Sequence, residues 1–209
     1  MQLRCSKSWA RTILCLCLLF VTTVHAESVL LVMGDSLSAE YGLATGTGWV
    51  ALLQHKLTQD GFAHQVINAS ISGETSAGGR ARIREALTAH RPAVVIVALG
   101  ANDGLRGQPV AMLRGNLEFM IKQSQKRGAR VMLVGQRLPP NYGAAYNRRF
   151  EAAFSEAATR TTTPLVPFML AGFATDRSMF QQDGLHPTAA AQSRIVDTVY
   201  PTLKPLLKK

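Results

Sequence analysis

A continuous apolar, β-branched run at residues 93–99 (AVVIVAL) constrains the fold of this chain more than any other feature. A strand with no polar residue on either side has both faces covered, as in the parallel sheets of α/β proteins. Similar apolar runs occur at residues 28–33 (SVLLVM) and 131–134. The pattern therefore predicts a sheet buried between two layers of helices.

Amphipathic segments alternate with these runs. Apolar side chains at positions 49, 50, 52, 53 and 57 have the spacing of one helical face. Strand–helix alternation of this kind predicts an α/β fold, a three-layer α/β/α sandwich on a parallel sheet. The other expected elements are strands at 66–67 and 165–166 and helices at 77–90, 113–126, 146–160 and 189–207, the last interrupted near Pro201.

The N-terminal segment has the three parts of a secretory signal peptide. Arg4, Lys7 and Arg11 precede an apolar run at residues 13–21, and small residues follow up to Ala26. The run is shorter than the roughly 20 residues that a membrane-spanning helix needs. We therefore expect a signal peptide over residues 1–26, cleaved after Ala26, and one domain over residues 27–209. An uncleaved membrane anchor is the alternative for this segment.

Export would limit the chemistry of the mature chain. All three cysteines (Cys5, Cys15 and Cys17) lie in the expected signal peptide, which leaves no thiol for a disulfide or a metal site. The formal net charge would fall from +10 to +7 with the loss of the three basic residues, and a positive balance favours anionic substrates or membrane surfaces. The basic residues are scattered without interleaved aromatic residues, so we expect no nucleic-acid partner. We expect a periplasmic or secreted monomer with at most peripheral membrane contact.

Polar residues follow the ends of the expected strands. In an open parallel sheet, active residues gather on the loops at the carboxyl ends of the strands. The sequence therefore predicts one site at this edge. Its loops are residues 34–36 (GDS), 72–73 (SG), 100–103 (GAND), 136–141 (QRLPPN) and 183–186 (DGLH).

Ser36 is the candidate nucleophile of this site. It lies where the first strand becomes a loop, directly after Gly34 and Asp35. A serine hydroxyl is a poor nucleophile unless a neighbouring base removes its proton. Taken alone, Asp35 and Ser36 would suit a helix cap equally well. The catalytic interpretation therefore depends on a base among the other loops.

His186 is the candidate base, in the segment DGLHP at the entry to the last expected helix. Asp183 lies three residues before it, across a turn that contains Gly184. We expect its carboxylate to accept a hydrogen bond from one ring nitrogen, while the other nitrogen faces Ser36. Such a carboxylate holds the tautomer and stabilises the imidazolium that forms. A turn followed by a helix cap is the alternative for this segment. The histidines with structural or solvated surroundings are His55, His64 and His90.

An acyl-transfer site also needs donors for the oxyanion, each worth about 10²–10³ in rate. The candidates are the backbone N–H of Ser36, the backbone N–H of Gly73 and the side-chain amide of Asn102. Gly73 has no side chain to cover its amide. Asn102 is expected on a loop freed by Gly100 and Gly104. Each residue alone would suit an ordinary turn, so the prediction rests on their convergence.

Mostly apolar residues in the same loops are candidates for an acyl-binding groove. Gly104 and Gly107 flank two of them, so we expect that loop to move on substrate binding. The candidates are Leu37, Leu105, Arg106, Leu138, Pro139, Pro140 and Tyr142.

The motifs resemble those of the SGNH-hydrolase superfamily, the GDSL-type lipases and esterases. The matching blocks are GDSLS (34–38), NASISGETS (68–76), LGANDGLRG (99–107) and DGLHP (183–187). The four residues that name the superfamily would be Ser36, Gly73, Asn102 and His186. RLPPNYG (137–143) also resembles the bacterial arylesterase branch described as multifunctional thioesterase I, protease I and lysophospholipase. The resemblance implies a flavodoxin-like, five-stranded sheet of order 2-1-3-4-5, no metal or other cofactor, and acyl esters, thioesters or lysophospholipids as small-molecule substrates.

The sequence as a whole predicts a serine esterase that forms an acyl-enzyme on Ser36. The alternatives are a carbohydrate O-acetylesterase of the cell envelope and a non-catalytic lipid- or flavin-binding module. A dinucleotide site is disfavoured, because the G-x-G-x-x-A match at residues 46–51 lies too far beyond the first strand. A metal hydrolase would need clustered ligands, which a single promising histidine does not supply.

Overall fold

The computed structural model describes residues 28–208 of the chain. The expected signal peptide, with its cleavage after Ala26, lies outside the described residues. Within the described part, none of the helices is long and apolar enough to span a membrane.

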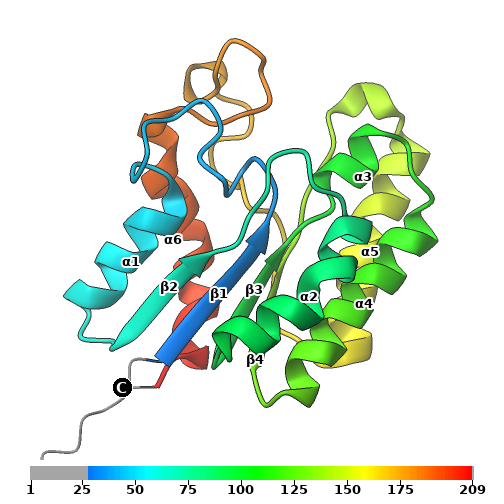
Figure 1. Cartoon of the computed structure of the whole chain (residues 1–209). Coiled ribbons are helices and arrows are strands. Elements are labelled where there is room, and N and C mark those ends of the chain that lie inside the picture. Colours follow the sequence, from blue (N-terminus) through cyan, green and yellow to red (C-terminus); the bar gives the residue numbers. More distant parts are fainter. Residues whose placement is uncertain (1–27, 209) are drawn as a thin grey trace, which may run out of the picture.

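The centre of the molecule is a five-stranded parallel sheet of order β2-β1-β3-β4-β5 (Figure 1). Both faces of β1 and β3 are covered, as their unbroken apolar sequences predict. The fold class and the strand order are therefore confirmed. The strands are β1 (Ser28–Gly34), β2 (His64–Asn68), β3 (Val94–Ala98), β4 (Arg130–Val134) and β5 (Leu165–Val166).

Helices cover the sheet in two layers, which lie to its left and right in Figure 1. Alternate residues of β1 enter different cores: Leu30 packs with α1 and α6, and Leu31 packs with α2, α4 and α5. The helices of the first layer are α1 (Trp49–Gln59) and α6 (Gln192–Leu203), and those of the second are α2 (Ser76–His90), α4 (Val110–Lys126) and α5 (Ala144–Thr161).

Several short helical turns join these elements. They are α3 (Ala101–Leu105), η1 (Pro140–Tyr142), η2 (Arg177–Met179), η3 (Ala189–Ala191) and η4 (Lys204–Leu206). The expected elements are all present, with ends that differ by a few residues.

The last helix differs from the expectation of a break near Pro201. Pro201 lies inside α6, which continues to Leu203 before the chain tightens into η4. A proline removes one helical hydrogen bond. The buried side chains of Val199, Tyr200 and Leu203 hold this part of the helix against the sheet despite that loss.

Candidate active site

Ser36 lies in a tight turn directly after β1, at the carboxyl edge of the sheet. The N–H groups of Ser38 and Ala39 donate to the carbonyl of Asp35 at 3.0 and 2.9 Å, and the N–H of Leu37 donates to the Asp35 carboxylate at 3.1 Å. The next regular element, α1, begins only at Trp49. The helix-cap alternative for Asp35 and Ser36 is therefore wrong, and the turn presents the half-buried Ser36 to neighbouring loops.

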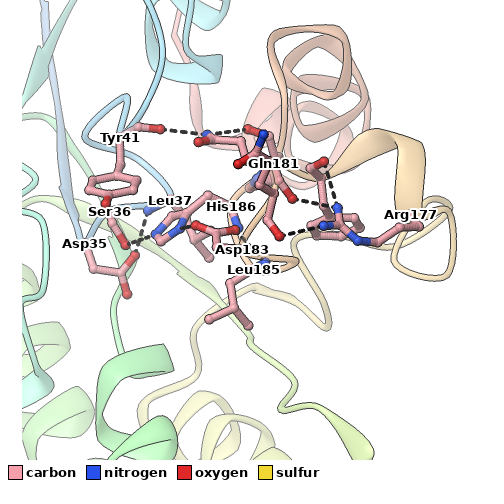
Figure 2. Close-up of polar contacts among 12 residues, drawn as sticks. Asp35, Ser36, Leu37, Tyr41, Arg177, Gln181, Asp183, Leu185 and His186 are labelled. Carbon is pink, nitrogen blue, oxygen red and sulfur yellow. Dashed lines mark hydrogen bonds and ion pairs between the residues drawn. The ribbon is translucent and has the colours of Figure 1, made fainter.

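The structure brings Ser36, His186 and Asp183 together in one chain of hydrogen bonds (Figure 2). Nε2 of His186 lies 2.9 Å from Oγ of Ser36, and Nδ1 of His186 lies 2.6 Å from Oδ2 of Asp183. With the proton on Nδ1, the imidazole donates to the carboxylate and Nε2 accepts from the serine hydroxyl. This geometry suits general-base activation of a serine.

The loop around Asp183 stabilises the ionised carboxylate. Its Oδ1 accepts the N–H groups of Leu185 and His186 at 2.9 and 3.0 Å. Partial burial alone would raise the pKa of Asp183, but these two N–H groups and the imidazole outweigh it and lower the pKa to about 2. Gly184 adopts φ +71° and lets the chain turn back toward the carboxylate. At neutral pH, Asp183 is therefore a fixed negative charge beside His186.

Tyr41 packs on the imidazole of His186, with 4.3 Å between ring centroids and 36° between ring planes. The contact places an aromatic face, of the kind that attracts cations, against the imidazole. The tyrosine is in the turn that carries Ser36, and its N–H approaches the Ser36 carbonyl at 3.5 Å. No motif in the sequence marks Tyr41, because its importance comes from a contact with a distant segment.

Gly73 and Asn102 lie on two adjoining segments, the loop after β2 and the start of α3, which are hydrogen-bonded to each other. Asn102 Nδ2 donates to the carbonyl of Glu74 at 3.0 Å, which uses one of the two amide hydrogens. Gly73 adopts φ +79°, and its carbonyl accepts from Arg106 Nη2 at 2.9 Å. The N–H of Ile71 donates to Gly34 at 3.1 Å, which holds the Gly73 loop beside the strand that leads to Ser36. The three predicted oxyanion donors therefore lie on neighbouring segments.

Asn102 is in the first turn of α3, whereas a loop freed by glycines was expected. Gly100 does need its freedom, because it adopts φ +126° at the helix start. Gly104 serves packing instead: a Cβ there would lie 2.6 Å from the side chains of both Leu138 and Phe150. The helix fixes the direction of the Asn102 side chain more firmly than a loop would.

A buried polar group lies next to Asn102, and no motif in the sequence identifies it. Asp103 is 2 % exposed and accepts hydrogen bonds from the N–H and hydroxyl of Ser76 at 2.7 and 2.5 Å. Asn116 donates to the same hydroxyl at 3.0 Å. Asp103 therefore joins the segment of Asn102 to the start of α2. The only signal in the sequence was the position of Asp103 beside Asn102.

Asp35 places a second buried carboxyl group beside Ser36. Burial raises the pKa of Asp35 to about 7; the N–H of Leu37 opposes this, and the carboxylates of Asp103 and Glu74 add to it. Among residues 28–208, its buried Oδ2 has no hydrogen-bond partner. The turn of the nucleophile therefore contains a carboxyl group that titrates near neutral pH.

The candidates for an acyl groove occupy different environments. Leu138, one of the candidates for lining this groove, is buried in the core beside Gly104. Arg106 and Pro140 are exposed, and Leu37, Leu105, Pro139 and Tyr142 are half-buried.

The expected mobile segment is tied down in this structure. The hydroxyl of Tyr142 donates to the carbonyl of Leu105 at 3.2 Å, and Arg106 donates to the carbonyl of Gly73.

Two cavities, of about 510 and 450 Å³, lie away from the Ser36 turn, one between α4 and α5 and the other beside β5 and α6. Neither is lined by Ser36 or His186. In residues 28–208, no three His, Cys, Asp or Glu side chains cluster as metal ligands would.

The doubly covered parallel sheet and the serine–histidine–aspartate geometry at its carboxyl edge define a serine hydrolase. The model of the GDSL-like lipase/acylhydrolase family matches residues 32–194, and the chain belongs to this family. The resemblance found in the sequence motifs is therefore confirmed, and the chain is an enzyme of the ester-hydrolase type.

The chain is also similar to named relatives. It is 49 % identical over 193 residues to esterase TesA of Pseudomonas aeruginosa, and these residues cover 92 % of this chain and 96 % of the relative. It is 38 % identical over 182 residues to thioesterase 1/protease 1/lysophospholipase L1 of Escherichia coli K12, at 87 % and 86 % coverage. The crystal structure of the psychrotrophic esterase EstA from Pseudoalteromonas sp., inhibited by monoethylphosphonate, is similar with a TM-score of 0.81, 40 % identity and coverage of 85 % and 97 %.

Proposed function

We propose that the chain hydrolyses carboxylic esters and thioesters of acyl chains through an acyl-enzyme on Ser36. The observation that carries this proposal is the continuous hydrogen bonding from Oγ of Ser36 through His186 to Asp183. One of the two relatives is named an esterase, and the name of the other includes thioesterase and lysophospholipase. These names support the proposed range of acyl substrates.

In the first half-reaction, Oγ of Ser36 attacks the acyl carbonyl carbon and its proton passes to Nε2 of His186. The tetrahedral oxyanion accepts hydrogen bonds from the N–H groups of Ser36 and Gly73 and from the side-chain amide of Asn102. His186 then gives its proton to the leaving oxygen or sulfur as the bond to that atom breaks. The products are a free alcohol or thiol and an ester of Ser36.

In the second half-reaction, His186 takes a proton from water, and the resulting hydroxide attacks the acyl carbon. The same donors hold the second oxyanion, and the proton returns to Oγ of Ser36 as the carboxylic acid leaves. Throughout, Asp183 holds the tautomer of His186 and stabilises its positive charge. Tyr41 adds to that stabilisation through the contact of its ring with the imidazole.

The acyl chain is proposed to lie along the half-buried and exposed apolar residues of the neighbouring loops. Leu37, Leu105, Pro139, Pro140 and Tyr142 keep this assignment together with the exposed Arg106, whereas Leu138 would become accessible only through a rearrangement. We also propose that residues 1–26 are a cleaved signal peptide and that the enzyme acts as a periplasmic or secreted monomer. The basic start and apolar run of the sequence support export.

A hydrolysis panel on wild type and Ser36→Ala tests the proposal. The panel consists of aryl esters, acyl-CoA thioesters and lysophospholipids of increasing chain length. We expect Ser36→Ala to lose at least about 10³-fold of the activity on every class, because one nucleophile serves them all. An organophosphonate should label wild type on Ser36 and leave Ser36→Ala unlabelled. Activity restricted to acetyl esters would favour the O-acetylesterase alternative, and absence of labelling would favour a non-catalytic binding module.

A further inference from the structure

The loop that carries Asp183 and His186 has little regular structure of its own. It lies between η2 and η3 and contains one isolated antiparallel bridge, between Phe180 and Pro187. Two backbone hydrogen bonds cross it, from the N–H of Gln181 to His186 and from the N–H of Thr188 to Met179, both at 2.8 Å. Loops with so few ladder bonds open easily. The position of His186 therefore depends on side chains that hold the loop.

Arg177 holds the loop from within. Its Nη1 donates to the carbonyls of Phe180 and Gln181 at 2.9 and 2.6 Å, and its Nη2 donates to the carbonyl of Gln182 at 2.7 Å (Figure 2). Three successive carbonyls thus converge on one guanidinium, and the next residue is Asp183. A guanidinium is a rigid, planar group with several donors, whereas an ammonium is a point charge. Arg177 therefore fixes the backbone conformation from which Asp183 extends.

Gln181 joins this loop to the turn of the nucleophile. Its side-chain Nε2 donates to the carbonyl of Tyr41 at 2.9 Å and to that of Pro187, the residue after His186, at 3.2 Å. The close approach needs Gly42, where a Cβ would lie 2.2 Å from Oε1 of Gln181. Gln181 is thus hydrogen-bonded both to the segment that carries Ser36 and to the segment that carries His186.

We propose that Arg177 and Gln181 form a clamp that sets the position of His186 relative to Ser36. The clamp consists of these two side chains and the five carbonyls that they bind, those of Tyr41, Phe180, Gln181, Gln182 and Pro187. Both are positioning residues, since neither touches Ser36. The inference rests on the proposed function, in which His186 acts on the proton of Ser36. A misplacement of about 1 Å can cost about 10²-fold in rate, so a loosened clamp would slow acylation without removing a reacting group.

The test compares Arg177→Ala and Gln181→Ala with two matched controls outside the clamp, Arg148→Ala and Gln59→Ala. The side chains of Arg148 and Gln59 are exposed and make no hydrogen bond within residues 28–208. We expect kcat/KM on an aryl ester to fall about 10- to 100-fold in both clamp variants and to stay within about twofold in the controls. Competitive inhibition by the carboxylic acid product should change less than about twofold. The rate of Ser36 labelling by an organophosphonate should fall in parallel with kcat/KM.

Two further measurements distinguish a clamp from a general structural role. Guanidinium ion at sub-denaturing concentration should restore part of the activity of Arg177→Ala and leave Gln181→Ala unchanged. The double variant should be at most about threefold slower than the slower single variant, because both side chains act on one loop. If the losses of kcat/KM in the two single variants multiply in the double variant, the clamp proposal is overturned. It is also overturned if the clamp variants retain the same activity as their controls.

If Arg177→Ala fails to fold by circular dichroism, the comparison of Gln181→Ala with Gln59→Ala decides the question alone. Two outcomes keep this inference separate from the proposed function. If Ser36→Ala retains activity, the proposed function fails. If Ser36→Ala is inactive while both clamp variants behave as the controls do, the clamp alone fails.

Discussion

Asp103 accepts two hydrogen bonds from Ser76, one from its N–H at 2.7 Å and one from its hydroxyl at 2.5 Å. Asp103 lies in α3, which follows β3, and Ser76 is the first residue of α2, which follows β2; each lies close to a proposed oxyanion donor. The pair therefore holds the loop of Gly73 and the helix of Asn102 in a fixed relation. Asn102 Nδ2 and the carbonyl of Glu74 add a second link between the same segments.

We expect Asp103→Asn to lower both stability and activity. An amide keeps the shape of the side chain, but its NH₂ group would face one of the two donors of Ser76. Loss of a buried hydrogen bond to a charged group costs about 1.5–3 kcal/mol. Urea unfolding measures this loss, and kcat/KM should fall about 10-fold through displacement of Asn102. Unchanged kinetics in a folded Asp103→Asn variant would contradict the link to the oxyanion donors.

Asn102→Ala should lower kcat/KM about 10²–10³-fold, as expected for the removal of one oxyanion donor. The fold should survive, because the half-buried Asn102 side chain makes a single hydrogen bond in the described structure, to Glu74. Steady-state kinetics on an aryl ester, with the unfolding midpoint alongside, measure both effects. Asn141→Ala is the matched control, since Asn141 is exposed in η1, and it should retain full activity.

Asp183→Asn should lower kcat about 10⁴-fold, the loss known for this change in a serine protease triad. Asparagine can still accept the N–H groups of Leu185 and His186, so the loop should keep its shape. Its amide NH₂ would face Nδ1 of His186 and favour the tautomer with the proton on Nε2. Single-turnover kinetics measure the loss. A variant within about 10-fold of wild type would show that Asp183 has no such role.

Asp35→Asn should change the dependence of stability on pH. Burial raises the pKa of Asp35 from 3.8 to about 7, so folding favours its protonated form. In wild type, Asp35 therefore does not lower the free energy of unfolding below about pH 4. It lowers this free energy by a growing amount as the pH rises toward 7, and by a constant amount above pH 7. The upper limit of this destabilisation is about 4 kcal/mol, at 1.36 kcal/mol per pKa unit. An asparagine keeps an acceptor for the N–H of Leu37 and cannot ionise.

Urea unfolding of wild type and Asp35→Asn from pH 5 to pH 8 measures this dependence. As the pH rises, the free energy of unfolding of Asp35→Asn should increase relative to that of wild type. Parallel curves would mean that Asp35 titrates alike in the folded and unfolded chains.

Gly104→Ala and Gly115→Ala should have opposite effects. A Cβ at Gly104 would lie 2.6 Å from Leu138 and Phe150, and overpacking of this kind costs about 1–3 kcal/mol. A Cβ at Gly115, inside α4, would meet no atom within 4 Å, and alanine is favoured over glycine in a helix by up to about 1 kcal/mol. Thermal unfolding of the two variants measures the difference. Equal shifts for both would show that Gly104 is not constrained by packing.

Much of the site could be predicted from local patterns. Ser36 and Asn102 follow buried strands, and the geometry of a parallel sheet brings such positions to one edge. His186 could be recognised because it lies beside Asp183 in a helix entry. The error at Gly104 had a different origin: a glycine permits either a flexible loop or a close contact, and only the positions of Leu138 and Phe150 decide between them.

The amino-acid sequence by itself determined the layered α/β architecture, the carboxyl edge of the sheet as the place of the site, and the three residues of the hydrogen-bonded chain. These features follow from apolar periodicity and from residue chemistry at strand ends, which are local properties. Only the tertiary structure decided the roles of Tyr41, Asp103, Arg177 and Gln181. These side chains bind carbonyls, an imidazole ring or a distant serine, and their partners become recognisable only when the loops are placed side by side.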